Sequence, residues 1–270
     1  MLTIFLMTIA FLGSHVLASL PTEIPNYSGL TLAYQDDFDN LNEAVWTIVD
    51  GFVQTPYAQV CYTANSVKVE NGNLVLTTRK ADAMCNFRGE NKRFSYTSGW
   101  IDSQGKFAVK DGMIEVRSQL PPPVNKIWPA AWVISDKNLR DTGLCWPISN
   151  EIDVYEMTGG LGNSDVCGSQ HYGFNCNEDL GNNYRCTARP DDGFHTYATR
   201  WGLNSNNQPF IIWYLDGKVY GKDEPAAAPI VDAMAVVLNI ALSANGSGPP
   251  GVDEVGVTHK VDWIRLWKGQ

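Results

Sequence analysis

Short runs of apolar and β-branched residues recur along the chain, and several of them are separated by dipeptides typical of tight turns. Asn71-Gly72 lies between residues 66–70 and 73–78, Asp111-Gly112 between 107–110 and 113–117, and Asp216-Gly217 between 210–215 and 218–220. Asn-Gly and Asp-Gly suit the positive φ angles of type I′ turns, which match the twist of the strands that they join. The pattern therefore predicts three β-hairpins.

Five further runs have the composition of strands, and no segment shows a sustained apolar period of 3.6 residues. These runs are residues 130–135, 151–156, 196–201, 235–242 and 259–267. Strands do not alternate with helical segments, which disfavours a parallel α/β sheet. We expect an all-β sandwich of antiparallel sheets. Because neither an internal repeat nor a low-complexity linker divides the chain, we expect a single domain over residues 19–270.

The first 18 residues read as a signal peptide for export rather than as part of the fold. Residues 1–12 form an apolar run, and Val16 and Ala18 place small residues at positions −3 and −1 of a cleavage site. The run is too short for a membrane anchor, so we expect a secreted, extracellular protein with no membrane attachment after cleavage. The formal net charge of −9 also lacks the basic footprint of a nucleic-acid-binding protein.

Secretion gives a reason for the six cysteines, because an even number in an exported chain favours disulfides. The sequence cannot choose among the possible pairings, but local pairs are favoured: Cys61 with Cys85, and Cys176 with Cys186. Zinc is disfavoured because the spacings lack a C-x-x-C knuckle. Two glycosylation sequons begin at Asn26 and Asn245.

The candidate chemistry is concentrated in residues 151–156, which read Glu-Ile-Asp-Val-Tyr-Glu. Side chains alternate along a strand, so Glu151 and Asp153 share a face and Glu156 would fall on the other. A single β-bulge at Val154 or Tyr155 would return Glu156 to the first face. The two glutamate carboxyls could then approach to about 5–6 Å, the separation that suits retaining glycoside hydrolysis.

Two other interpretations of this acidic segment remain open. Charges at every second position are ordinary on an exposed strand, and clustered carboxylates also suit calcium. Aromatic residues upstream favour the catalytic interpretation, because Trp128, Trp132 and Trp146 could line a glycan cleft while each indole N–H finds a partner.

The run of residues 151–156 resembles the bulged E-x-D-x-x-E signature of glycoside hydrolase family sixteen, in the form typical of laminarinase-like endo-β-1,3(4)-glucanases. Further stretches resemble family segments in the same order over nearly the whole mature chain: Asp36-Asp37-Phe38 with Trp46, Ser98-Gly99, Phe107, 112–117, Trp128-Pro129-Ala130-Ala131-Trp132, 146–151, His171-Tyr172, 194–197 with Trp201, 214–217, 238–241 and 262–266. Any one of these matches is weak, and their shared order makes the resemblance specific.

The resemblance implies a β-jelly-roll of two curved antiparallel sheets with a concave glycan cleft. Carried over by residue, Glu151 would be the nucleophile, Glu156 the general acid/base and Asp153 the residue that tunes the nucleophile. Trp132 and Trp146 would stack on donor-side glucose rings, and His171 would lie near the acid/base on the acceptor side. Trp128, Asn239 and Arg117 are interpreted as structural. The chemistry requires no metal or other cofactor, and we expect a monomer that hydrolyses β-1,3 or mixed β-1,3/1,4 glucan.

Departures from the family pattern bear on substrate detail. Asn150 stands where the family usually has glycine before the nucleophile, and Cys145 could fix the loop of residues 135–145 through a disulfide. Three alternative functions stay open: a transglycosylase of the same family, a non-catalytic β-glucan-binding protein, and an enzyme acting on a sulfated or galactan polymer. The six-residue acidic spacing disfavours the first, both retained glutamates disfavour the second, and the negative charge of the chain disfavours the third.

Overall fold

The computed structural model describes residues 27–53, 58–87, 89–124, 126–137, 145–157, 165–176, 178–181, 183–243 and 255–270. The signal peptide over residues 1–18, the sequons at Asn26 and Asn245, and most of the loop of residues 135–145 lie outside these ranges. Within them no helix has the length and apolar character that a membrane crossing requires.

The described residues form two large antiparallel sheets and one small sheet. The first large sheet has the strand order β17 (Lys218–Asp223), β16 (Pro209–Leu215), β15 (His195–Leu203), β10 (Gly112–Gln119), β19 (Thr258–Gly269), β5 (Asn73–Thr77) and β4 (Val67–Glu70), with β1 (Leu30–Asp36) also paired to β19. The second has the order β14 (Arg185–Thr187), β13 (Val166–His171), β12 (Glu151–Glu156), β11 (Ile127–Ser135), β18 (Met234–Leu242), β8 (Trp100–Asp102) and β2 (Thr47–Ile48), with β9 (Ala108–Val109) also paired to β18.

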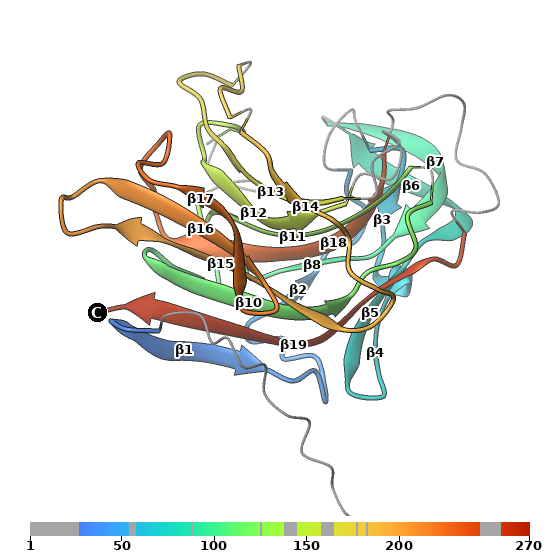
Figure 1. Cartoon of the computed structure of the whole chain (residues 1–270). Helices are drawn as coiled ribbons and strands as arrows, with labels where there is room; N and C mark the ends of the chain where they lie inside the picture. Colours follow the sequence, from blue (N-terminus) through green and yellow to red (C-terminus); the bar gives the residue numbers. More distant parts are fainter. Residues whose placement is uncertain are drawn as a thin grey trace, which may run out of the picture.

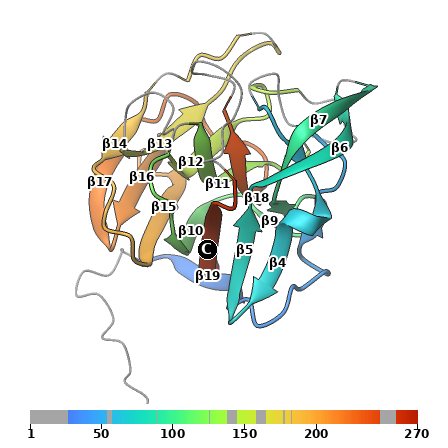
Figure 2. The same cartoon turned by 90° about the vertical axis from the view of Figure 1, so that its right-hand side faces the viewer.

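The small sheet consists of β3 (Cys61–Tyr62), β7 (Glu90–Ser98) and β6 (Arg79–Phe87), and a 3-10 turn (Ala64–Ser66) follows β3. Figure 1 shows the two large sheets as curved layers lying over one another, and in Figure 2 the β6–β7 hairpin stands away from both layers. The expected all-β sandwich of two curved antiparallel sheets is therefore confirmed.

A continuous apolar core fills the space between the two large sheets. Both sheets contribute large side chains to it, including Trp100 and Tyr155 from the second sheet and Trp201, Trp213 and Tyr197 from the first. Burial of such aromatic surface is the main source of stability in a sandwich of this kind. It also leaves the outer face of the second sheet as a rigid base for a site.

Two of the three predicted hairpins are confirmed. The Asn71-Gly72 turn joins β4 to β5, the Asp216-Gly217 turn joins β16 to β17, and all four turn residues have positive φ. The predicted strands over residues 130–135, 151–156, 196–201, 235–242 and 259–267 also form, within β11, β12, β15, β18 and β19.

The predicted hairpin around Asp111-Gly112 is wrong. Strand β9 pairs with β18 in the second sheet, whereas β10 pairs with β15 and β19 in the first, so the chain changes sheets at this dipeptide. Gly112 serves a different purpose, because a Cβ atom there would collide with the backbone carbonyl of Trp267 on β19. The glycine permits close approach of two strands rather than a tight turn.

All six cysteines form disulfides, of which Cys61–Cys85 is the pair expected from the sequence. The expected Cys176–Cys186 bond is wrong. Cys186 lies directly opposite Cys167 in the β13–β14 ladder and bonds to it, and Cys176 instead bonds to Cys145. Strand register therefore decided a pairing that closeness along the chain could not.

Candidate active site

A β-bulge in β12 aligns the three acidic residues of that strand. Asp153 pairs with Ser169 of β13 and Glu156 with Cys167, so two residues of β12 lie opposite the single residue that separates these partners. On the other side Glu156, Asp153 and Glu151 pair with Ala130, Trp132 and Ile134, which alternate along β11. Because paired residues point to the same face, all three carboxylates share one face of the second sheet. The bulge expected at residues 154–155 is confirmed.

Asn150 begins this strand with a positive φ of 53°. Glycine adopts such a conformation without strain, and asparagine tolerates it better than other side chains. The replacement of the family's usual glycine by asparagine is therefore compatible with the same backbone turn into the strand.

The bulge is fixed from the core side by a buried hydrogen-bond chain. Tyr155 lies between Asp153 and Glu156 but points into the sandwich, where its hydroxyl lies 2.8 Å from His259 Nε2 and 2.6 Å from Ser118 Oγ. His259 Nδ1 lies 3.0 Å from the carbonyl oxygen of Asn239 and donates to it, so Nε2 accepts from the tyrosine. Complete burial lowers the pKa of His259 to about 4 and keeps the imidazole neutral.

Glu156 lies at the partly exposed end of the acidic row and accepts a hydrogen bond of 2.8 Å from the indole Nε1–H of Trp128. Burial and the negative charge of Asp153 raise the pKa of Glu156 to about 8, and the charge of His171 and the indole bond oppose that rise. At neutral pH this carboxyl therefore carries a proton, which is the state that a general acid needs.

Trp128 was interpreted from the sequence as a core residue, and the structure corrects that interpretation. Alternation along β11 could have found its position, because Trp128 and Trp132 are four residues apart and must share a face. Trp132 does lie on the face of the carboxylates, but its side chain is 3% exposed. It packs edge-on against Trp100 and donates to Asn239, which leaves little ring surface for a sugar.

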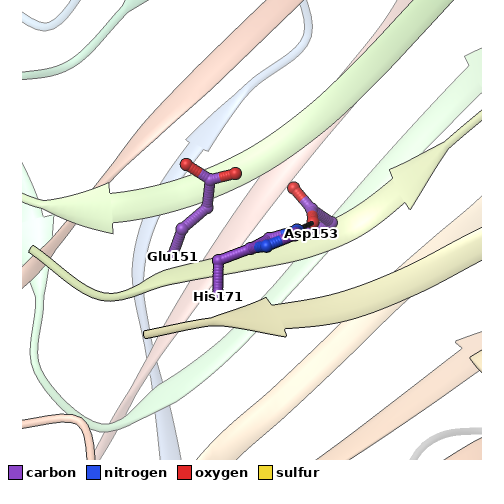
Figure 3. A group of neighbouring side chains, drawn as sticks. All are labelled: Glu151, Asp153 and His171. Atoms are coloured by element: carbon purple, nitrogen blue, oxygen red, sulfur yellow. Dashed lines mark ion pairs between the residues drawn. The ribbon is translucent and has the colours of Figure 1, made fainter. Parts of the chain in front are cut away.

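Glu151 and Asp153 are both buried, and His171 from β13 lies directly opposite Glu151 (Figure 3). Burial and the charge of Asp153 raise the pKa of Glu151 well above its usual range, while the charge of His171 opposes this rise. The sequence analysis placed His171 near Glu156, and the register corrects this by placing it at the Glu151 end of the row.

His171 is held between two carboxylates that sequence reasoning did not connect to it. Its Nε2 lies 3.2 Å from Asp153 Oδ2 and its Nδ1 lies 2.6 Å from Asp179 Oδ2. Burial lowers its pKa, but the two hydrogen bonds raise it further, so the ring is an imidazolium. Ser169 adds a third partner by donating its hydroxyl to Asp153.

Glu151, Asp153 and His171 could in principle hold a metal ion, because their ligand atoms lie within 4.8 Å of one another. The chemistry of the set does not fit one, because both nitrogens of His171 bind carboxylates and a protonated imidazole has no lone pair for a metal. The arrangement instead balances one imidazolium against three carboxyls, of which Glu156 is protonated.

Trp146 lies beside this cluster and is 38% exposed, with its ring centroid 5.7 Å from that of His171. The Cys145–Cys176 disulfide anchors the neighbouring backbone. Of the two tryptophans expected to bind sugar, Trp146 therefore presents an accessible ring and Trp132 does not.

Paired acidic groups on one face of a curved β-sandwich, with a protonated and a charge-balanced carboxyl side by side, define a site of the glycoside hydrolase kind. The model of the family described as Glycosyl hydrolases family 16 matches residues 54–265, and the chain belongs to that family. The resemblance found in the sequence is confirmed.

Curated relatives are bacterial glucanases. The chain is 27% identical over 280 residues to glucan endo-1,3-beta-glucosidase A1 of Niallia circulans, with 93% of this chain and 39% of that protein covered. It is 27% identical over 206 residues to endo-1,3-1,4-beta-glycanase ExsH of Rhizobium meliloti, with 76% and 40% covered. The chain thus spans about two-fifths of the length of these relatives.

Solved structures share the fold. SCLam, a non-specific endo-beta-1,3(4)-glucanase from family GH16, is 25% identical with a TM-score of 0.71 over 92% of this chain and 97% of that one. The laminarinase catalytic domain of Thermotoga maritima is 22% identical with a TM-score of 0.68 over 89% and 99%. A chain from work on endo-acting O-glycanases of the human gut microbiota is 21% identical with a TM-score of 0.75 over 92% and 94%. The fold alone therefore does not select the substrate.

Proposed function

We propose that the protein is a secreted, retaining endo-glycosidase that hydrolyses β-1,3 or mixed β-1,3/1,4 glucans by double displacement. The observation that carries the proposal is the bulged strand β12, which aligns Glu151, Asp153 and Glu156 on one face and gives the two glutamates different partners. The endo-1,3(4)-glucanase relatives support the substrate class.

In the first step, the carboxylate of Glu151 attacks the anomeric carbon, and Glu156 gives its proton to the departing glycosidic oxygen. A covalent glycosyl ester on Glu151 results, and the acceptor part of the glucan leaves with its new hydroxyl. Glu156 is then ionised and removes a proton from water, which attacks the anomeric carbon and releases Glu151. The configuration at that carbon is inverted twice and so retained.

Asp153 and His171 support the nucleophile in this scheme. The imidazolium between Asp153 and Asp179 places positive charge beside Glu151, which favours its ionised form against the effect of burial. Asp153 in turn holds His171 in place and keeps negative charge close to Glu156, which favours the protonated form of the acid.

The roles of the two glutamates are tested by chemical rescue. Glu151→Ala and Glu156→Ala should both lose hydrolysis, with the acid/base loss in the range of about 10²–10⁴-fold that such groups contribute. With an activated aryl β-laminaribioside, azide should rescue Glu151→Ala to an α-glycosyl azide and Glu156→Ala to a β-glycosyl azide. Reversed configurations would exchange the two roles, and a first-formed product of inverted anomeric configuration with the unsubstituted enzyme would refute the retaining scheme.

The substrate class is tested by release of reducing ends from laminarin, lichenan, xyloglucan, agarose, carrageenan and mucin. Release from the first two alone supports the proposal, and release from another polymer in their place contradicts it. Binding of laminarin without release would support the non-catalytic alternative. Secretion is tested by export of the full chain, with a mature N-terminus at Ser19 expected.

A further inference from the structure

The cleft face continues beyond the acidic row onto the edge strand β14, where it presents a disulfide and an aromatic ring. Cys186 of β14 pairs with Cys167 of β13, which itself pairs with Glu156, so these three residues lie in one row across the sheet. Continuing the β13–β14 register by one position places Tyr184 beside Ser169, the partner of Asp153. Because residues in one row share a face, Tyr184 and the Cys167–Cys186 disulfide lie on the face of the carboxylates.

Tyr184 is an accessible ring at a rigid position. Its side chain is 52% exposed, and its ring centroid lies 6.0 Å from that of His171 in an edge-on arrangement. The next residue, Arg185, donates its Nε–H to Asp223 of β17 at 2.8 Å, and Cys186 is bonded to Cys167. The backbone that carries the ring is therefore tied to both large sheets.

The position of Tyr184 favours one end of the cleft. The ring lies across β13 from β12, on the opposite side of the catalytic strand from Trp128. The electrostatic influence of Glu156 and Asp153 reaches its hydroxyl and contributes, after burial and against the charge of His171, to a raised pKa. Glu156 protonates the oxygen of the departing sugar, so a ring on this side is placed to meet that sugar.

We propose that Tyr184, beside the Cys167–Cys186 disulfide, forms an acceptor subsite in which its ring stacks on the glucosyl unit that leaves in the first step. The inference rests on the proposed function and deepens it, because it assigns the side of the cleft that binds the leaving group. A glucosyl ring has an apolar face of C–H groups, which suits a flat aromatic ring with one exposed side. An exposed tyrosine contributes large contact area and loses little side-chain entropy on binding.

The experiment compares a substrate that has acceptor sugars with one that has none. Laminaripentaose fills both sides of the cleft, whereas β-laminaribiosyl fluoride has a leaving group with no ring. For Tyr184→Ala, we expect the ratio of kcat/KM on the pentaose to kcat/KM on the fluoride to fall about tenfold, the change that corresponds to one stacked aromatic contact. Tyr184→Phe keeps the ring and should keep the ratio.

A second readout is independent of the hydrolytic rate on the pentaose. With the fluoride as donor and added laminaribiose as acceptor, Tyr184→Ala should lower the ratio of transfer product to hydrolysis product. Leu203→Ala removes an exposed apolar side chain (55% exposed) from the first sheet and serves as the matched control, with neither ratio changed.

The outcomes separate this inference from the proposed function. If the unsubstituted enzyme cleaves neither the pentaose nor the fluoride, the proposed function fails. If it cleaves both and Tyr184→Ala leaves the two ratios unchanged, or if Tyr184→Phe lowers them as much as Tyr184→Ala does, the stacking subsite is wrong while the glucanase proposal stands. Thermal unfolding followed by circular dichroism confirms that each variant is folded.

Discussion

The indole of Trp128 should set the alkaline limit of activity. Its Nε1–H donates to Glu156 at 2.8 Å and stabilises the ionised carboxylate, which lowers a pKa that burial and Asp153 have raised to about 8. Replacing Trp128 by phenylalanine keeps an aromatic ring but removes the donor. The ionised form of Glu156 then loses a partner, so the pKa must rise further.

The size of the rise follows from the hydrogen bond. A bond to a charged group contributes about 1.5 kcal/mol at the lower end of its range, and we use that end because Glu156 is partly exposed. One pKa unit corresponds to about 1.4 kcal/mol. In the Trp128→Phe variant, the alkaline limb of kcat/KM should therefore move from about pH 8 to about pH 9.

The assay is the pH dependence of kcat/KM on laminarin, because this parameter reports ionisations of the free enzyme. Trp267→Phe is the matched control: that indole donates to Glu115 at 2.7 Å in the first sheet, so its loss should leave the limb in place. An alkaline limb that stays fixed or moves to lower pH in Trp128→Phe would refute the assignment of Glu156 as the proton donor.

Two predictions concern stability. Because the folded pKa of buried His259 is about 4, only the unfolded chain takes up a proton as the pH falls from about 6.5, and the wild type should lose up to about 3 kcal/mol that His259→Gln does not lose. Urea unfolding from pH 7 to pH 4 checks this, and parallel pH profiles for the two proteins would contradict it. For Glu156 the folded pKa is raised to about 8, so its stabilising effect is complete below the unfolded pKa and is lost as the pH rises through 8. Glu156→Gln should therefore melt above the wild type at pH 9 and level with it near pH 5, and a lower melting temperature at pH 9 would show that the carboxylate is not strained by burial.

Features coded by neighbouring residues were predictable from the sequence. The Asn71-Gly72 and Asp216-Gly217 turns formed because their backbone conformation depends on the two residues themselves. The bulge in β12 was predictable because three carboxylates could share a face only if one extra residue was accommodated. In each case the information lay within about six residues of chain, which is the range over which pattern arguments hold.

Features that depend on register between distant strands were not predictable. Gly112 matched a turn signal, but its role is to allow β19 to approach, and nothing near it in the chain indicates that contact. Cys186 had a closer cysteine in the sequence, yet the β13–β14 ladder brings Cys167 directly opposite. Asp179 reached the site in the same way, through a loop whose only sequence signal is an ordinary aspartate.

The bulge links the core of the sandwich to the chemistry on its outer face. Without it, strict alternation would point Glu156 inward and Tyr155 outward, so one extra residue both exposes the acid and buries the phenol. The buried phenol then binds Ser118 of β10 and His259 of β19, which are strands of the opposite sheet. A shift of β12 by one position would expose that hydroxyl to cleft and leave both partners unsatisfied in the core, at a cost that a buried polar group always carries. The register that serves catalysis is therefore the register that the core enforces, and the position of Glu156 depends on side chains in the core that no substrate contacts.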